Sequence, residues 1–292
     1  MGELRDRMVR EMDLRNFSPR TVESYVDQVK GLAKYYRRPP DQLSNDEIQR
    51  YLLSVREERR LSSSTCNQLR AALKFFYEVT LQRPHAALAI PPMRSAQQLP
   101  EILSREEVER LLGTTRTLRE RLLLMVAYGA GLRVSEVVAL RPADLDAERG
   151  VIRVVQGKGR KDRYTVLANR LETEGARYYA VYGRPEHWLF PQRSDATRHV
   201  DIGTVQKIYT ATKRRAGVTK AGGIHSLRHA FATHSLEAGL DLPTLGRMLG
   251  HTSVTTTMRY LHTTTKRVSA QISPLDRLLF AARRDTLLDA PQ

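Results

Sequence analysis

The chain has 292 residues and is strongly basic: 48 lysines and arginines stand against 32 aspartates and glutamates, which gives a formal net charge of +16. Hydrophobic residues make up 41%, enough to build packed cores, and this excludes wholesale disorder. The single cysteine, Cys66, excludes a disulfide framework and a multi-cysteine zinc site. We find no signal-peptide pattern and no apolar run of the about 20 residues that span a bilayer, so we expect an intracellular protein without membrane contact. The charge predicts a polyanionic partner, above all nucleic acid.

The N-terminal part, residues 1–83, predicts a bundle of about four short helices and has almost no strand pattern. Ser18 followed by Pro19 is a helix-start signal, because a capping residue precedes proline at the first helical position. Ser44 and Glu47 have the spacing of a capping box for a further helix. These signals predict a small all-helical domain.

Prolines punctuate residues 84–100, which therefore cannot form one regular element and are predicted to be an interdomain linker. A second domain is predicted over residues 101–292, with a tail at about 269–292. It opens with another capping box, formed by Ser104 and Glu107.

A hairpin is predicted in the middle of this second domain. Residues 151–155 and 163–167 are rich in β-formers, and they flank a cationic turn that contains glycine, residues 157–162. The fold class is therefore mainly α with a small β-sheet. Further helices are predicted over residues 205–215, 227–238, 242–249 and 254–261.

Six residues of the second domain together supply two guanidinium groups, an ammonium group, imidazoles and a phenol. This set suits phosphoryl transfer without a metal, because arginine forks match phosphate oxygens and stay charged. Lysine or histidine can move a proton at neutral pH, and tyrosine can act as a covalent nucleophile. The six residues are Arg133, Lys158, His225, Arg228, His251 and Tyr260.

Each of these residues alone has an ordinary structural explanation. Arg133 suits a salt bridge on a helix surface, Lys158 a solvated turn and Tyr260 a partly buried core aromatic. The functional interpretation depends on the ordered set, which unrelated structural roles do not predict.

The histidines also raise the possibility of a zinc site. His225 and His229 are four residues apart, as in H-E-x-x-H, but Ser226 stands where that motif has its general base. No carboxylate offers a natural third ligand. We therefore predict no metal and no cofactor, and we interpret His229 and His234 as structural.

The ordered set resembles the catalytic domain of the tyrosine recombinases, also called the phage integrase family. Their pattern runs Arg, Lys, His-x-x-Arg, His or Trp, and Tyr, and the six residues match it in order. The resemblance covers nearly the whole chain, because the family also has an N-terminal helical core-binding (SAM-like) domain that residues 1–83 resemble. The surrounding motifs also match: Gly131-Leu132-Arg133, Gly157-Lys158-Gly159, Leu227-Arg228-His229, Leu249-Gly250-His251 and Thr256-Thr257-Met258-Arg259-Tyr260.

The resemblance implies a specific chemistry. Tyr260 would attack a DNA phosphodiester and form a 3′-phosphotyrosyl intermediate with a free 5′-hydroxyl, without metal or ATP. Arg133 and Arg228 would neutralise the charge on the non-bridging oxygens, and Lys158 would protonate the leaving 5′-oxygen.

Three further residues receive supporting roles from the resemblance. His225 would assist proton transfer at the tyrosine, and His251 would hydrogen-bond the phosphate. Glu136, one turn after Arg133, would support that arginine, with an ordinary charge on a helix face as the alternative.

Within the family the chain is most similar to compact Xer-like and integron-integrase-like enzymes. Its ending at residues 273–276 is similar to that of integron integrases, but the short stretch from Phe190 to His225 leaves little room for their extra segment. A mobile-element or Xer-like recombinase fits better.

The resemblance implies a site-specific recombinase that exchanges strands between two double-stranded DNA sites through a Holliday junction. It would act in the cytoplasm at the nucleoid, as a homo-tetramer held by exchange of the C-terminal tail, with a second recombinase or accessory protein as a possible partner. Packing of the tail within its own chain is the alternative to this exchange. Two alternatives stay open: DNA relaxation like that of type IB topoisomerases, and a non-catalytic DNA-binding protein.

Overall fold

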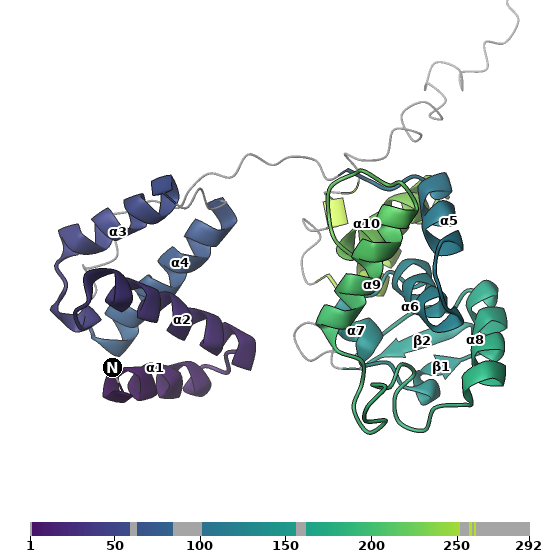
Figure 1. Ribbon diagram of the computed structural model, residues 1–292, viewed down its shortest axis with the longest axis horizontal. Coiled ribbons are helices and arrows are strands. Elements are labelled where there is room, and N and C mark those ends of the chain that lie inside the picture. The colour runs from purple at the N-terminus through teal and green to yellow at the C-terminus, as the bar shows by residue number, and fades with distance from the viewer. Residues whose placement is uncertain are drawn as a thin grey trace, which may run out of the picture. The chain divides into compact units, whose positions relative to one another are not determined.

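The computed structural model describes residues 2–58, 63–83, 101–155, 162–251, 257–258 and 260. The chain divides into two compact units, Met1–Gln98 and Leu99–Gln292 (Figure 1). The described residues are mainly helical with one small sheet, so the predicted fold class is confirmed. Among them, every helix falls short of the length and apolar character that a membrane crossing needs.

The described part of the N-terminal unit is helical, as the sequence predicts. Thr21 N donates to the side chain of Ser18 over 3.2 Å, and Ser44 N donates to the carboxylate of Glu47 over 2.9 Å, so both predicted helix starts are confirmed. The apolar faces of the helices meet in one core. The elements are α1 (Gly2–Leu14), α2 (Pro19–Tyr36), η1 (Pro40–Gln42), α3 (Asn45–Glu58), α4 (Ser63–Phe75) and η2 (Phe76–Thr80).

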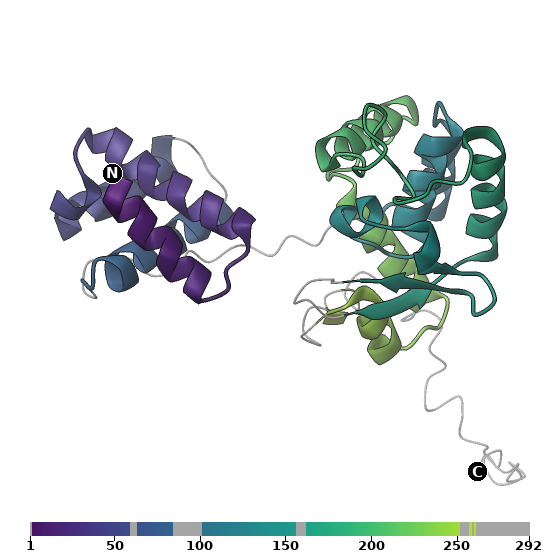
Figure 2. The same cartoon turned by 90° about the horizontal axis from the view of Figure 1, so that it is seen from below.

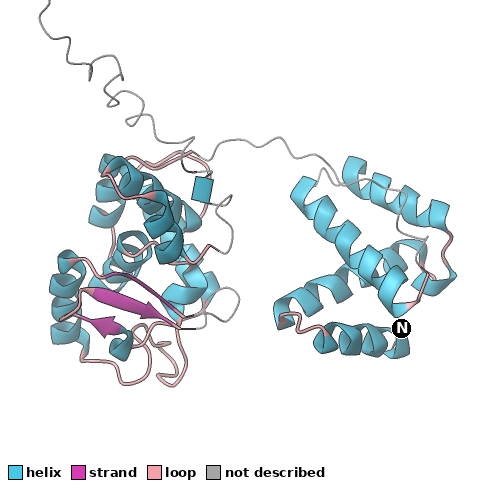
Figure 3. Cartoon of the chain, turned by 180° about the vertical axis from the view of Figure 1, so that it is seen from behind, coloured by secondary structure: helices cyan, strands magenta, loops and turns pink. Residues whose placement is uncertain are grey.

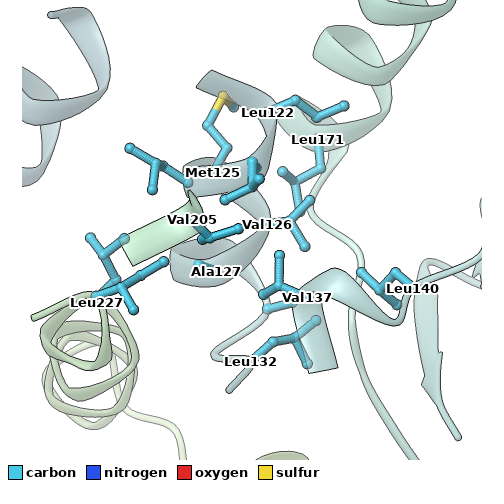
Figure 4. Close-up of a cluster of buried hydrophobic side chains, with 14 of the residues drawn as sticks. Leu122, Met125, Val126, Ala127, Leu132, Val137, Leu140, Leu171, Val205 and Leu227 are labelled. Carbon is cyan, nitrogen blue, oxygen red and sulfur yellow. The ribbon is translucent and has the colours of Figure 1, made fainter. Parts of the chain in front are cut away.

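The C-terminal unit surrounds helix α6, whose residues 122–127 are all buried. Figure 4 shows side chains of α6 beside Val137, Leu171, Val205 and Leu227, which belong to four other helices of this unit. A helix that is apolar all round belongs in the middle of a core. The helices are α5 (Arg105–Gly113), α6 (Leu118–Gly129), α7 (Val134–Val138), η3 (Pro142–Asp144), α8 (Asn169–Tyr182), α9 (Ile202–Arg215), α10 (His225–Glu237) and α11 (Leu242–Leu249).

The predicted hairpin is present as β2 (Val151–Val154) and β3 (Arg163–Val166), which pair antiparallel with Ile152 opposite Thr165. Each strand ends one residue before its predicted limit. With β1 (Leu145–Asp146) they form a sheet in the order β1-β2-β3 (Figure 3). The hydroxyl of Thr165 donates to the carbonyl of Ala130 over 2.9 Å, and α11 packs beside β3 (Figure 2). The sheet is thereby joined to the loop between α6 and α7 and to α11.

Strand β1 and helix α8 are among the elements that escape the sequence analysis, each for lack of a local signal. The two residues of β1 are too few to show alternation. Helix α8 has no side-chain cap at Ala168, so no start signal marks it. The predicted helices at 205–215, 227–238 and 242–249 correspond to α9, α10 and α11.

Three segments named by the sequence analysis lie outside the described residues. They are the linker at 84–100, the turn that contains Lys158, and the tail at 269–292. Of the helix predicted over 254–261, the structure describes Thr257 and Met258 as helical and Tyr260 as a turn.

The break between α6 and α7 requires glycine. Gly131 has φ +62°, and a Cβ there would lie 2.3 Å from Cδ1 of Phe231. Helix α10 therefore approaches this loop closely. Two residues after Gly131, Arg133 caps α7, and its backbone N–H donates to Glu136 over 2.8 Å. Helix α7 thus begins directly after this glycine break.

Candidate active site

Arg228 lies on α10 and is 1% exposed, which is rare for arginine. Its guanidinium donates to the carbonyl of Gly131 over 2.8 Å and to that of Leu249 over 2.6 Å. These carbonyls belong to the loop before α7 and to the end of α11. The buried fork therefore fastens three segments that are distant in the sequence, and its orientation is fixed by the backbone.

Glu136 gathers three guanidinium groups around one buried carboxylate. Arg133 donates to it over 2.7 Å, Arg163 donates two hydrogen bonds over 2.8 and 2.7 Å, and Arg228 lies 3.7 Å away. Burial raises the pKa of this carboxyl, but the hydrogen bonds from Arg163 and Arg133 outweigh it and hold the pKa at about 2. Three positive charges thus face one negative charge, and the surplus suits an anion such as phosphate.

The Glu136→Gln variant is expected to lose about 3 kcal/mol of unfolding free energy near neutral pH, because the carboxyl's pKa falls from 4.5 to about 2 on folding. The unfolded carboxyl takes up its proton at the higher pH, so wild-type stability is complete above pH 4.5 and falls as the pH drops towards 2. The variant lacks this dependence. Chemical denaturation over that pH range measures both effects.

Glu186→Gln is the matched control, because the side chain of Glu186 is 88% exposed. It should leave the unfolding free energy unchanged. Equal stability of the Glu136 and Glu186 variants would contradict the electrostatic role of Glu136.

His251 joins the arginine cluster to Tyr260. Its Nε2 lies 3.2 Å from a guanidinium nitrogen of Arg228, and its Nδ1 lies 2.8 Å from the hydroxyl of Thr257. Its ring is stacked with that of Tyr260 at a centroid distance of 6.2 Å and an angle of 11°. Tyr260 itself is 5% exposed. The phenol and the guanidinium therefore share one imidazole neighbour.

Two histidines of α10 lie on the same face, one helical turn apart. Nδ1 of His229 is 3.0 Å from the hydroxyl oxygen of Tyr260, and the ring of His225 packs edge-on against that of His229 at 4.8 Å. Burial, and then the charge of Arg228, lower the pKa of His229 below its ordinary value. Burial also lowers the pKa of His225. Part of this residue is exposed, and contact with solvent weakens the effect of burial. Both rings are neutral at pH 7.

Comparison with known proteins follows the same division of the chain. Residues 101–267 match the phage integrase family, and residues 4–87 match the phage integrase N-terminal SAM-like domain. The chain belongs to the phage integrase family. The resemblance drawn from the ordered residues is thereby confirmed.

Relatives of this integrase-family chain extend over almost its full length. It is 40% identical over 280 residues to a Sinorhizobium fredii protein, y4qK, provisionally named an integrase/recombinase. The aligned stretch covers 95% of this chain and 90% of that protein. It is 34% identical over 259 residues to tyrosine recombinase XerA of Thermococcus kodakarensis, covering 87% and 88% respectively. Its fold is similar to that of a lambda integrase tetramer bound to a Holliday junction, with a TM-score of 0.72 at 16% identity over 91% of this chain and 77% of that one.

The structure of this integrase-family chain brings five of the six candidate residues into one cluster with Glu136. Lys158 lies outside the described residues. Among the described residues, no group of three or more histidine, cysteine or acidic side chains could hold a metal ion. The clustered candidates are Arg133, His225, Arg228, His251 and Tyr260.

Two residues of the cluster were not anticipated as functional. Arg163 begins β3 and, besides its pair with Glu136, donates through Nε to the carbonyl of Met248 over 2.8 Å. No sequence signal marks it. His229 was interpreted as structural, although its spacing from His225 already placed both rings on one helix face.

Proposed function

We propose that this member of the phage integrase family is a site-specific DNA recombinase that breaks and rejoins strands through Tyr260. The observation that supports this most strongly is the shared contact of His251, whose ring stacks on Tyr260 while its Nε2 lies 3.2 Å from Arg228. The phenol of Tyr260 and the buried guanidinium of Arg228 thus lie on either side of one imidazole. Nucleophilic attack on a phosphodiester needs a nucleophile and a cation that binds the phosphate close to each other.

The proposed step conserves the energy of the phosphodiester bond. The oxygen of Tyr260 bonds to phosphorus, the bond from phosphorus to the 5′-oxygen breaks, and Lys158 gives a proton to the leaving oxygen. Arg133 and Arg228 neutralise the charge on the non-bridging oxygens, and donors of this kind contribute about 3–4 kcal/mol each. The 3′-phosphotyrosyl bond is then open to attack by another 5′-hydroxyl, so strands can be exchanged without ATP.

The remaining candidates act around the same phosphate. His251 is assigned a hydrogen bond to a phosphate oxygen. Its Nε2 accepts from the guanidinium of Arg228 in the structure, so this nitrogen must exchange that contact for the phosphate and carry a proton once DNA is bound. His225 assists proton transfer from the tyrosine. Glu136 holds the arginines in place, which its contacts with Arg133 and Arg163 support.

We propose a clamp on double-stranded DNA, with residues 1–83 as the core-binding domain, 84–100 as a linker and 101–292 as the catalytic domain. Phosphate contacts would dominate its affinity, in keeping with the net charge of +16. Strand exchange between two sites calls for four protomers, which the tail at 269–292 would hold together, with a second recombinase or accessory protein where the sites require one. The fold shared with the tetrameric lambda integrase is compatible with this assembly, and the cytoplasmic nucleoid is its proposed location.

The decisive experiment follows the covalent intermediate. A recombination site is first selected from random duplexes by binding to the full-length protein, and a nicked suicide substrate is built from it. We expect an SDS-stable protein–DNA adduct whose peptide maps to Tyr260. Absence of an adduct, or its attachment elsewhere, would overturn the proposal.

Two additions to the same assay separate the alternatives. EDTA should leave the rate of adduct formation unchanged, because guanidinium groups supply the electrostatic stabilisation. Relaxation of a plasmid that lacks the selected site would favour topoisomerase activity instead. DNA binding without any adduct would favour a non-catalytic role.

A further inference from the structure

The hydroxyl of Tyr260 has a histidine partner outside the family pattern. Nδ1 of His229 lies 3.0 Å from the phenolic oxygen, which is within the range in which a proton passes between two groups. His225, to which the pattern assigns the proton transfer, packs its ring edge-on against His229. The order of contacts is therefore Tyr260, His229, His225.

The surroundings of His229 suit a proton acceptor. Tyr260 is 5% exposed, so bulk water has little access to its hydroxyl. Burial and the charge of Arg228 hold the pKa of the His229 imidazole below its ordinary value, so the ring is neutral at pH 7 and keeps one nitrogen without a proton. With the proton on Nε2, Nδ1 accepts the hydrogen bond that the tyrosine hydroxyl donates.

We propose that His229 accepts the phenolic proton of Tyr260 as the tyrosine oxygen attacks phosphorus. The inference rests on the proposed function. The O–H bond of Tyr260 breaks, its electron pair forms the bond to phosphorus, and the proton moves to Nδ1 of His229. The bond to the 5′-oxygen breaks at the same time and takes its proton from Lys158. In the reverse direction His229 returns its proton to the tyrosine, and His225 acts through its ring contact with His229.

The charges around His229 couple this step to DNA binding. Arg228 and His225 face it from α10, and His251 and Tyr260 face the same space from the C-terminal side. The positive charge of Arg228 opposes protonation of His229 while the site is empty. A DNA phosphate beside Arg228 offsets that charge, so the imidazole becomes more basic when the substrate is in place.

The test uses His229→Ala and His229→Asn in the full-length protein, with the selected suicide duplex as the probe. The oxygen of asparagine accepts a hydrogen bond at the place of Nδ1 but cannot hold the proton, so this variant separates orientation from proton transfer. We expect both variants to form the adduct about 10²-fold more slowly than the wild type at pH 7. Their rates should rise with pH more steeply than that of the wild type, because the tyrosine must then lose its proton to solvent.

A second substrate separates the two proton transfers. A duplex with sulfur in place of the 5′-bridging oxygen has a leaving group that needs no proton. It should restore the rate of Lys158→Ala and leave the His229 variants slow. A fluorinated tyrosine at position 260, whose phenol ionises more readily, should instead restore His229→Asn. His187→Asn is the matched control, because the side chain of His187 is 56% exposed, and its rate should equal that of the wild type.

Two results would overturn the inference. One is a wild-type rate for His229→Asn, which would leave His229 an orienting role only. The other is a pH profile of either variant that runs parallel to that of the wild type. Thermal unfolding and DNA binding of each variant report whether it is folded, and His229→Asn carries the test if the alanine variant is destabilised. Failure of the wild type itself to form an adduct would refute the proposed function rather than this inference.

Discussion

The Tyr260→Phe variant is expected to bind the selected duplex as tightly as the wild type and to form no SDS-stable adduct. The change removes the nucleophilic oxygen alone, and the ring keeps its place against His251. Without that oxygen the bond to phosphorus cannot form at this position. The lost hydrogen bond to His229 costs about 1 kcal/mol of stability, which is too little to unfold the domain. Gel electrophoresis in SDS measures the adduct, and a filter assay measures binding.

Tyr182→Phe is the control for this variant, because Tyr182 is 51% exposed on α8. It should form the adduct at the wild-type rate. A Tyr260→Phe protein that still crosslinks to DNA would show that another residue is the nucleophile.

Replacement of Arg228 by alanine is expected to impair folding and catalysis together. The buried carbonyls of Gly131 and Leu249 lose their donor, and the side chain leaves a cavity, so we expect a loss of about 3–5 kcal/mol of unfolding free energy. Cleavage should slow by about 10²–10³-fold, because one of the two arginines proposed to bind the phosphate is absent. Chemical denaturation and single-turnover cleavage measure the two effects.

Arg228→Lys separates the two contributions. Lysine keeps the positive charge but lacks the planar guanidinium with its two parallel donors. Relative to Arg228→Ala, Arg228→Lys should therefore recover a larger part of the lost stability than of the lost cleavage activity. Arg170→Ala, at an exposed position of α8, should change neither quantity. Full cleavage activity in Arg228→Ala would exclude the guanidinium from the chemistry.

Local signals in the sequence were sufficient for much of the fold. The capping residues Ser18 and Ser44 mark helix starts because a side chain and a backbone N–H three residues later meet within one turn. The hairpin is likewise a local event, since its two strands are joined by a short turn. An element without such a signal, such as α8 after Ala168, escaped prediction.

Long-range contacts explain what the sequence could not supply about the site. Arg163 meets Glu136 from a strand 27 residues away, and neither spacing nor motif indicates which side chain completes the ion cluster. The spacing of His225 and His229 placed both on one face of a helix, but which of the two rings contacts Tyr260 depends on the tertiary position of that tyrosine. Sequence pattern therefore identified the kinds of groups present and left their pairing to tertiary structure.

The shared carboxylate of Glu136 has a mechanical consequence. Its three arginines belong to the start of α7, to β3 and to α10. Arg163 is the first residue of β3 and follows Lys158 by five residues in the sequence. These pieces of backbone are anchored to a single point and cannot drift apart independently. A disturbance of any one of them is transmitted to the others, so loss of alignment in this enzyme should be collective rather than confined to one side chain.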